Sequence, residues 1–227
     1  MRRELEDVDR AEPLAGRGER GRDRSGVRAA VARAQDELGG IDVVLNNAGI
    51  GYFAAVEESD DAEVRRMMEI NVFGLAAVTA AALPGMRARR TGTILNVSSV
   101  GGVRSFPAVG WYNASKFAVE GLSEALDLEV EHLGIRVVLV EPSGFATDWA
   151  GSSAAEVAPG DEIADYAETA GANRLCFRES AGSEPGDPAR AARAIGNFAY
   201  DGILEKLDAV RDDIAAREGV SRGADRD

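Results

Sequence analysis

Three short apolar runs separated by two long helical stretches constrain the fold of this chain more than any other feature. The runs are Ile41–Leu45, Thr93–Val97 and Ile135–Val140, and the last two are almost continuous Val, Ile and Leu. Such runs are typical of parallel strands that are covered on both faces. The stretches between them, at about 60–87 and 110–132, have helical periodicity. This order of elements predicts an α/β fold with a doubly wound, Rossmann-like parallel sheet.

The segments that flank this pattern are of a different kind. Residues 1–25 are rich in charge and poor in apolar residues, so we predict a charged flexible arm. A helix is expected from Gly26 to Gly39-Gly40, and two more at about 188–199 and 203–217. Residues 148–187 show only weak helical stretches, around 162–170. The predicted organisation is an arm over 1–25, one domain over 26–217 and a disordered tail over 218–227.

Composition limits the possible partners. The net charge of −13 argues against nucleic acid and against an anionic membrane surface, because both attract a basic face. One cysteine and one histidine make a disulfide framework or a Cys/His metal site implausible. No apolar run approaches the length of a membrane span, and the first residues lack the apolar stretch of a secretory signal. We therefore expect a cytoplasmic protein without a metal.

Three residues suggest acid–base chemistry. Tyr112 and Lys116 are four residues apart within a predicted helix, which places them on one face. A nearby ammonium favours the phenolate, so we expect Lys116 to lower the pKa of Tyr112. Ser99 follows the second predicted strand, and ligands of open α/β sheets bind beyond the carboxyl ends of the strands. Its hydroxyl is placed to donate to a substrate oxygen.

The order and spacing of several motifs resemble the classical short-chain dehydrogenase/reductase family, with most similarity to its hydroxysteroid- and retinol-dehydrogenase-like branch. The resemblance covers roughly residues 26–150. Its motifs are Asn46-Asn-Ala-Gly49 after a strand, Asn71 in a helix, Ser99 thirteen residues before Tyr112, Tyr112-Asn-Ala-Ser-Lys116, and Glu141-Pro-Ser-Gly-Phe-Ala-Thr147. Ser143 stands where the family usually has glycine, which would crowd the backbone beside the nicotinamide.

The resemblance implies the role of each catalytic residue. Tyr112 would be the general acid or base, Ser99 would polarise the substrate oxygen, and Asn71 would hold a water that links Lys116 to solvent. Lys116 would lower the pKa of Tyr112 and hold the nicotinamide ribose. The cofactor, NAD or NADP, would be bound by Asn46, Asn47, Ala48, Gly49, Tyr112, Lys116, Pro142, Phe145 and Thr147.

The pattern is incomplete on its N-terminal side. The family begins with strands and a glycine-rich turn that binds the pyrophosphate, but only forty residues precede Ile41. Gly16-Arg-Gly-Glu-Arg-Gly21 has the spacing of a dinucleotide motif. However, residues 8–15 do not form a convincing strand and contain Pro13, so we interpret these glycines as part of a linker. We therefore expect an exposed sheet edge, and the choice between NAD and NADP is not readable.

Three hypotheses follow. The first is an NAD(P)(H)-dependent oxidoreductase that acts on a small hydrophobic alcohol or ketone and forms a homodimer or homotetramer. An apolar wall for the substrate is suggested by Tyr52, Phe53, Phe106, Trp111 and Trp149. The second is a non-catalytic remnant of the family that dimerises through the helices at 60–87 and 110–132. The third is redox-free chemistry on the same scaffold, against which the retained Lys116 counts.

Overall fold

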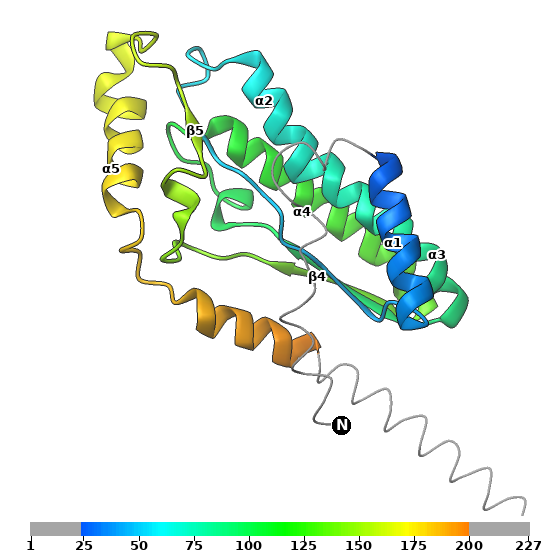
Figure 1. Cartoon of the computed structure of the whole chain (residues 1–227). Coiled ribbons are helices and arrows are strands. Elements are labelled where there is room, and N and C mark those ends of the chain that lie inside the picture. Colours follow the sequence, from blue (N-terminus) through cyan, green and yellow to red (C-terminus); the bar gives the residue numbers. More distant parts are fainter. Residues whose placement is uncertain (1–23, 200–227) are drawn as a thin grey trace, which may run out of the picture. The chain divides into compact units, whose positions relative to one another are not determined.

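A computed structural model describes residues 24–199 (Figure 1). The chain divides into two compact units after Gly186, and each is described here by itself. The tail over 218–227, the helix at 203–217 and all but the last two residues of the arm lie outside the described residues. The glycines of segment 16–21 also lie outside them. The predictions for these segments stay predictions.

Three parallel strands form the main sheet of the first unit. They are β1 (Val43–Asn46), β3 (Gly92–Val97) and β4 (Ile135–Val140), in the order β1-β3-β4. Leu95 of β3 pairs with Leu45 on one side and Val138 on the other. The central strand β3 is buried along all but its last residue, which explains its apolar run. The predicted doubly wound parallel sheet is confirmed.

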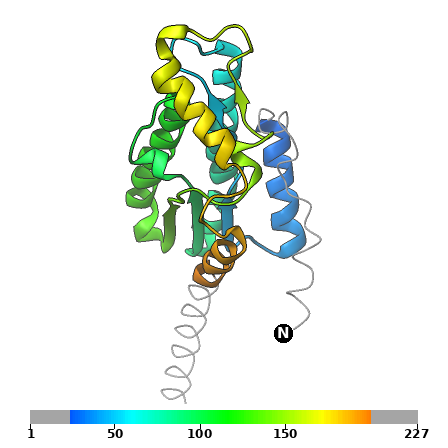
Figure 2. The same cartoon turned by 90° about the vertical axis from the view of Figure 1, so that its left-hand side faces the viewer.

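Helices α1 (Arg24–Leu38), α3 (Leu75–Arg89) and α4 (Gly110–Val130) cover one face of this sheet (Figures 1 and 2). The apolar core between the sheet and these helices includes Val31, Val44, Met86, Ile94, Val130 and Ile135. On the opposite face of β1, Leu45 is 48% exposed. Within the described residues, β1 pairs only with β3 and is therefore an edge strand. This agrees with the expected incompleteness on the N-terminal side.

A π-helical segment interrupts the long helix predicted at 60–87. The helix consists of α2 (Asp61–Met68), the π-helix η3 (Glu69–Gly74) and α3. Asp60 caps its first turn by accepting a hydrogen bond from the backbone N–H of Glu63 at 2.9 Å. The wider π-helical turn contains Asn71 and Val72, both of which are buried. Such turns often occur at functional sites.

The same helix corrects one sequence expectation. Asp61–Arg89 is long and apolar enough, by length and composition, to be a candidate membrane span. We had expected no such segment. In this fold, however, the helix packs against α4 and against strands β1 and β3, and it contributes Ala82 and Met86 to the core. This packing buries 33% of the apolar window and accounts for that part of its apolar character.

A second, two-stranded sheet lies near the carboxyl ends of the main strands and was not predicted. Strands β2 (Tyr52–Phe53) and β5 (Ala155–Glu156) pair in parallel. The short turns η7 (Ala164–Tyr166) and η8 (Ala167–Gly171) then lead into α5 (Ala172–Ser180). The weak helical stretch predicted at 162–170 thus falls on these turns, whereas α5 itself was missed.

The second unit contributes one described helix, over residues 188–199. Asp187 caps it by accepting hydrogen bonds from the backbone N–H groups of Ala189 and Arg190, at 2.8 and 3.1 Å. Pro188 occupies the first helical position, where its missing N–H costs nothing. The predicted helix at 188–199 is confirmed.

Candidate active site

One cavity of about 600 Å3 lies where the carboxyl ends of the strands of the first unit meet α4. The loops after β1, β3 and β4 each contribute to its wall, through Gly49, Ser99 and Pro142. These loops are held together by backbone hydrogen bonds, among them Ser98 N to Val140 O at 2.8 Å. The cavity is also lined by Asn47, Tyr112, Lys116, Phe145 and Thr147. The structure thus brings most of the predicted site residues together.

Tyr112 and Lys116 lie one turn apart on α4, and both are buried. The Lys116 Nζ donates a hydrogen bond to the Val97 carbonyl at the end of β3, at 2.8 Å. The same Nζ is 5.8 Å from the centre of the Tyr112 ring. The ammonium is therefore fixed between the end of the central strand and the phenol, as the spacing in the sequence predicts.

Ser99 is held at the N-terminus of the short 3₁₀ turn η4 (Val100–Gly102). Its Oγ accepts a hydrogen bond from the backbone N–H of Gly101 at 3.0 Å. The Ser99 side chain interacts with the Tyr112 hydroxyl in a way that lowers the pKa of Tyr112. Hydroxyl groups from the loop after β3 and from α4 therefore line the same cavity, where one substrate oxygen can contact both.

The electrostatics of the pair differ from the sequence expectation. Burial raises the pKa of Tyr112, and the hydrogen bond with Ser99 lowers it in part. Burial also lowers the pKa of Lys116 to about 8, against the attraction of the Glu120 carboxylate one turn further along α4. The pKa of Tyr112 is therefore raised overall and not lowered, because desolvation of the phenolate outweighs the other effects. The phenol is thus the stable form at neutral pH.

Asn71 joins three elements of the site. Its Oδ1 accepts a hydrogen bond from the Ile50 N–H at 2.8 Å, and its Nδ2 donates to the Ile50 carbonyl at 3.0 Å. The Nδ2 also donates to the Ser115 Oγ on α4 at 3.1 Å. A side chain on Gly49 would place its Cβ 3.4 Å from the Asn71 Oδ1 and 3.5 Å from the Lys116 Nζ. Asn71 therefore fixes the loop after β1 against α4; its expected role in holding a water stays a prediction.

The residues predicted to bind a cofactor divide into two groups. Asn47, Gly49, Pro142, Phe145 and Thr147 line the cavity, and so does Ser143. The Asn46 side chain is buried instead, where it donates to Thr79 and Asn96, at 3.0 and 2.8 Å. Asn46 therefore stabilises the packing of β1 against α3 and β3. Ala48 is exposed and is not part of the cavity wall.

The expected apolar wall is only partly correct. Phe106 and Trp149 line the cavity, and the Trp149 ring lies 4.8 Å from the Tyr112 ring. Tyr52 and Phe53 belong to the buried core beneath it, and Trp111 is 38% exposed on α4. Sequence reasoning missed Val109 and Phe177, which complete the wall. A pattern of aromatic residues signals burial, but it does not separate core from cavity.

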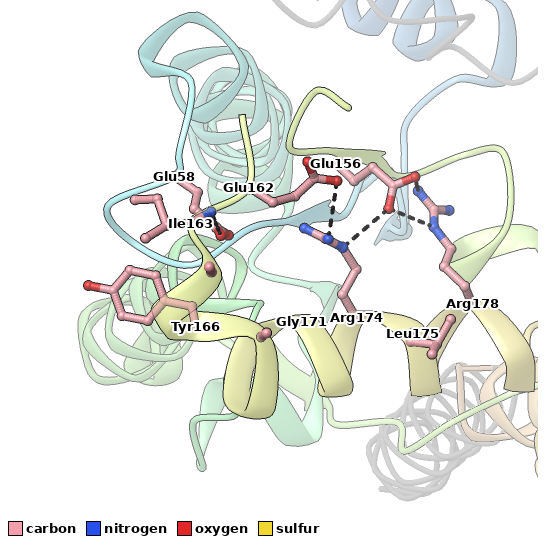
Figure 3. A pocket seen from close by; sticks show the side chains of 11 residues that line it. Glu58, Glu156, Glu162, Ile163, Tyr166, Gly171, Arg174, Leu175 and Arg178 are labelled. Atoms are coloured by element: carbon pink, nitrogen blue, oxygen red, sulfur yellow. Dashed lines mark hydrogen bonds and ion pairs between the residues drawn. The ribbon is translucent and has the colours of Figure 1, made fainter. Parts of the chain in front are cut away.

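Helix α5 closes one side of the cavity through Phe177. The Phe177 ring stacks on Phe53 at 5.4 Å and meets Trp149 edge-on at 6.2 Å. A second cavity of about 540 Å3 is lined by other residues of α5, Arg174, Leu175 and Arg178 (Figure 3). The two cavities share no lining residue, although α5 contributes to both.

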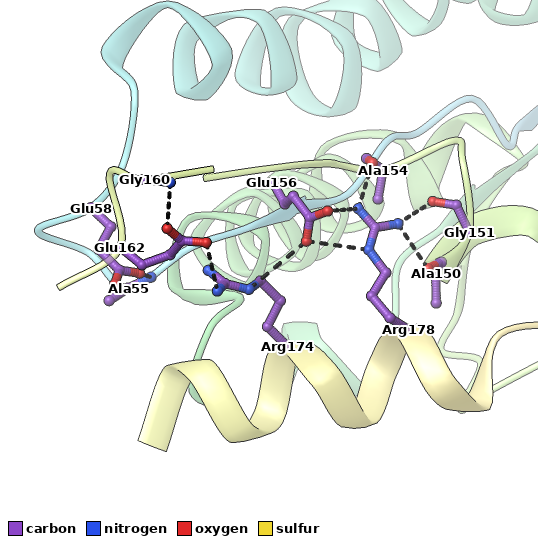
Figure 4. A network of polar contacts seen from close by, with 10 residues as sticks. All are labelled: Ala55, Glu58, Ala150, Gly151, Ala154, Glu156, Gly160, Glu162, Arg174 and Arg178. Atoms are coloured by element: carbon purple, nitrogen blue, oxygen red, sulfur yellow. Dashed lines mark hydrogen bonds and ion pairs between the residues drawn. The ribbon is translucent and has the colours of Figure 1, made fainter. Parts of the chain in front are cut away.

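Arg178 fastens α5 to the loop that carries Trp149 (Figure 4). Its guanidinium donates to the carbonyls of Ala150 and Ala154, at 3.0 and 3.1 Å, and to that of Gly151. It also pairs with Glu156 at 3.3 Å. Arg174 makes looser ion pairs, at 3.8 Å with Glu156 and 3.6 Å with Glu162 (a residue also shown in Figure 4).

We expect Arg178→Ala to lower the free energy of unfolding by about 3 kcal/mol, because it leaves several carbonyls without their donor. Amide hydrogen exchange over 172–180 should accelerate in the same variant. Arg174→Ala is the matched control, and its loss should stay below about 1 kcal/mol because its ion pairs are long. Urea denaturation measures both values. Equal losses in the two variants would show that Arg178 does not fasten the helix.

The parallel sheet and the cavity at the carboxyl ends of its strands define a Rossmann-like α/β protein. The family model for the short chain dehydrogenases matches residues 19–158. The chain belongs to this family.

Similar proteins include two curated relatives. A 3-ketodihydrosphingosine reductase of Bacteroides thetaiotaomicron is 50% identical over 121 residues, which cover 53% of this chain and 45% of the relative. The oxidoreductase BOA17 of Botryotinia fuckeliana is 39% identical over 173 residues, which cover 76% of this chain and 62% of the relative. The chain thus spans about half the length of these relatives.

Solved structures show the same fold. A short-chain dehydrogenase from Streptomyces avermitilis has a TM-score of 0.71 at 37% identity, covering 89% of this chain and 78% of that protein. A gluconate 5-dehydrogenase from Burkholderia cenocepacia, in complex with NADP and tartrate, has a TM-score of 0.57 at 29% identity. That likeness covers 58% of this chain and 52% of the dehydrogenase.

The residues present fit the nicotinamide half of a dinucleotide. The absence of a side chain at Gly49 opens a space against the Lys116 ammonium, which can hold ribose hydroxyls. Phe145 and Thr147 line the same cavity. In the family, the pyrophosphate binds at a glycine-rich turn after the first strand. Residues 24–199 begin with α1 and do not include that strand and turn. The fit is therefore to the reactive half of the cofactor.

Proposed function

We propose that the chain is an NAD(P)(H)-dependent oxidoreductase of the short-chain dehydrogenase type that acts on a small hydrophobic alcohol or ketone. The observation that carries the proposal is the convergence of Ser99, Tyr112 and Lys116 on one cavity. The relative from Bacteroides thetaiotaomicron is named as the reductase of a ketone, which supports the reaction class. The choice between NAD and NADP stays open.

The residues divide the chemistry of a carbonyl reduction among them. The bound nicotinamide would supply the hydride, and in the reverse direction would accept it. The Ser99 and Tyr112 hydroxyls bind the substrate oxygen, and Tyr112 donates its proton to that oxygen as negative charge develops. Lys116 stabilises the resulting phenolate. The raised pKa of Tyr112 keeps the phenol protonated before reaction, which suits reduction.

Apolar surface on α4 supports a homo-oligomer. Phe117, Leu122 and Leu128 are 47%, 46% and 78% exposed along this helix. Exposed apolar residues grouped on one element favour a protein–protein contact. We propose a homodimer or homotetramer in a cytoplasmic location.

Within residues 24–199, β1 lies at the edge of the sheet, which favours a second candidate, a non-catalytic binding module of the same family. Turnover separates the two candidates. The full chain is mixed with NADH or NADPH and a panel of apolar ketones, and with NAD or NADP and the matching alcohols. Cofactor-dependent turnover supports the oxidoreductase. If no combination of cofactor and substrate gives turnover, although the chain self-associates and melts cooperatively, the binding module is favoured.

A further inference from the structure

The wall of the active-site cavity contains a carboxyl group to which the proposed chemistry gives no task. Glu184 lies just beyond α5 and lines the cavity together with Ser180 and Phe177. Its Oε2 is buried and has no hydrogen-bond partner within the described part of the chain. A buried acceptor without a donor costs free energy, so its placement calls for an explanation.

The position of Glu184 is fixed by the backbone around it. Two residues further on, Gly186 donates to the Gly144 carbonyl at 3.0 Å and accepts from the Ala146 N–H at 2.9 Å. The Glu184 side chain packs on Gly144, where an added Cβ would lie 3.3 Å from the Glu184 Cγ. The carboxyl group is therefore held beside the segment after β4, which also carries Phe145.

Charge in the cavity favours a donor as the partner of Glu184. The charged residues in the cavity wall are Lys116, Asp148 and Glu184. Asp148 already accepts hydrogen bonds from Ser152 and Ser153, at 2.9 and 2.6 Å, and these bonds lower its pKa. Two carboxyl groups in this wall favour a ligand group that donates hydrogen bonds to them. Among the described residues, no donor contacts the Glu184 Oε2, so this oxygen can accept a hydrogen bond from a ligand.

We propose that Glu184 is a ligand-binding residue that accepts a hydrogen bond from an N–H group of the bound ligand. Building on the proposed function, this names a substrate class: apolar alcohols or ketones that also carry an amino group. The other source of such a donor is the carboxamide of the nicotinamide. Both groups offer an N–H donor to Glu184, and the experiment distinguishes a donor on the substrate from one on the cofactor.

The probes are 1-phenylethanol and 2-amino-1-phenylethanol, which differ by one amino group, and NADH and NADPH. Binding is followed by Trp149 fluorescence in a full chain carrying Trp111→Phe, because the chain has two tryptophans and Trp149 lies in the cavity wall. We expect the amino alcohol to bind about tenfold more tightly than the alcohol, as for a hydrogen bond to a charged group. Glu184→Gln, which removes the charge, should reduce this preference, and Glu184→Met, which removes the acceptor, should abolish it.

Glu179→Gln is the control, since Glu179 is an exposed carboxyl on α5 and should leave the preference intact. Weaker binding of NADH or NADPH in Glu184→Met, with the preference unchanged, would place the N–H donor on the cofactor and still support the acceptor role. Unchanged binding of all four probes in both Glu184 variants would overturn it. Binding is measured without turnover, so a chain that shows the preference but no reaction would contradict the proposed function alone.

Discussion

Tyr112→Phe should reduce kcat by about 10³-fold or more, because it removes only the hydroxyl that transfers the proton, and general acid–base catalysis contributes up to about 10⁴-fold. The ring remains, so its contact with Trp149 should persist and hold the cavity together. The measurement is the steady-state rate with the best ketone found for the wild-type chain. Cofactor binding should change less than kcat, since Lys116, which would also hold the ribose, is retained.

The control is Tyr166→Phe. Tyr166 donates to the Glu57 carboxylate at 2.6 Å and lines the second cavity. The same chemical change there should leave kcat within about twofold of the wild type, as expected for a group that does not act in proton transfer. A Tyr112→Phe variant with wild-type kcat would show that another group transfers the proton.

Lys116→Met should abolish turnover and yet raise the free energy of unfolding at pH 7 by about 2 kcal/mol. Burial lowers the pKa of Lys116 from 10.5 to about 8, a shift worth roughly 3 kcal/mol against the charged form. The lost hydrogen bond to the Val97 carbonyl offsets part of that gain. Urea denaturation of the two chains at pH 7 measures the difference.

The effect has a defined pH dependence. Below pH 8 both the folded and the unfolded wild type carry the proton on Lys116, so the cost of burying the charge is complete. Between about 8 and 10.5 the unfolded chain binds more protons at this residue than the folded chain. The contribution of Lys116 therefore makes stability rise with pH across this window. Above 10.5 the cost is gone, and the advantage of the methionine variant should vanish.

Lys116→Arg provides the contrast, because an arginine keeps its charge throughout this range. It should be no more stable than the wild type at pH 7 and should lack the rise above pH 8. A Lys116→Met chain that is less stable than the wild type at pH 7 would contradict a costly buried ammonium. Together these variants separate the catalytic use of Lys116 from its effect on folding.

The parts of the fold predicted from the sequence are those with a strong local signal. The apolar run of β3 indicates a strand of a parallel sheet, and the spacing of Tyr112 and Lys116 indicates a shared helix face, so both were correct. The Asp187-Pro188 pair likewise marks a helix start. These features depend on neighbours within a few residues, which the sequence displays directly.

Features that depend on distant contacts were missed. Strand β2 has two residues and exists because β5, about a hundred positions later, pairs with it. Helix α5 is fixed by Arg178, whose partners are carbonyls that any sequence has. Asn46 was assigned to the cofactor because its motif resembles that of the family, but its partners Thr79 and Asn96 become visible only in the folded chain.

The expected pKa of Tyr112 went wrong for a related reason. Spacing places the ammonium of Lys116 near the phenol, but it does not reveal how deeply both groups are buried. Tyr112 is 8% exposed and Lys116 is 5% exposed, so desolvation determines both shifts. Glu184 was missed because nothing in its local sequence marks it.

The most direct test of the central claim, that this cavity holds a nicotinamide dinucleotide against Tyr112 and Lys116, is a titration of the full chain with NADH and NADPH. Nicotinamide fluorescence and the melting temperature are followed together. We predict saturable binding of at least one of them, a raised Tm, and weaker binding in Lys116→Met. No saturable binding of either dinucleotide, by a chain that still melts cooperatively, would contradict the account.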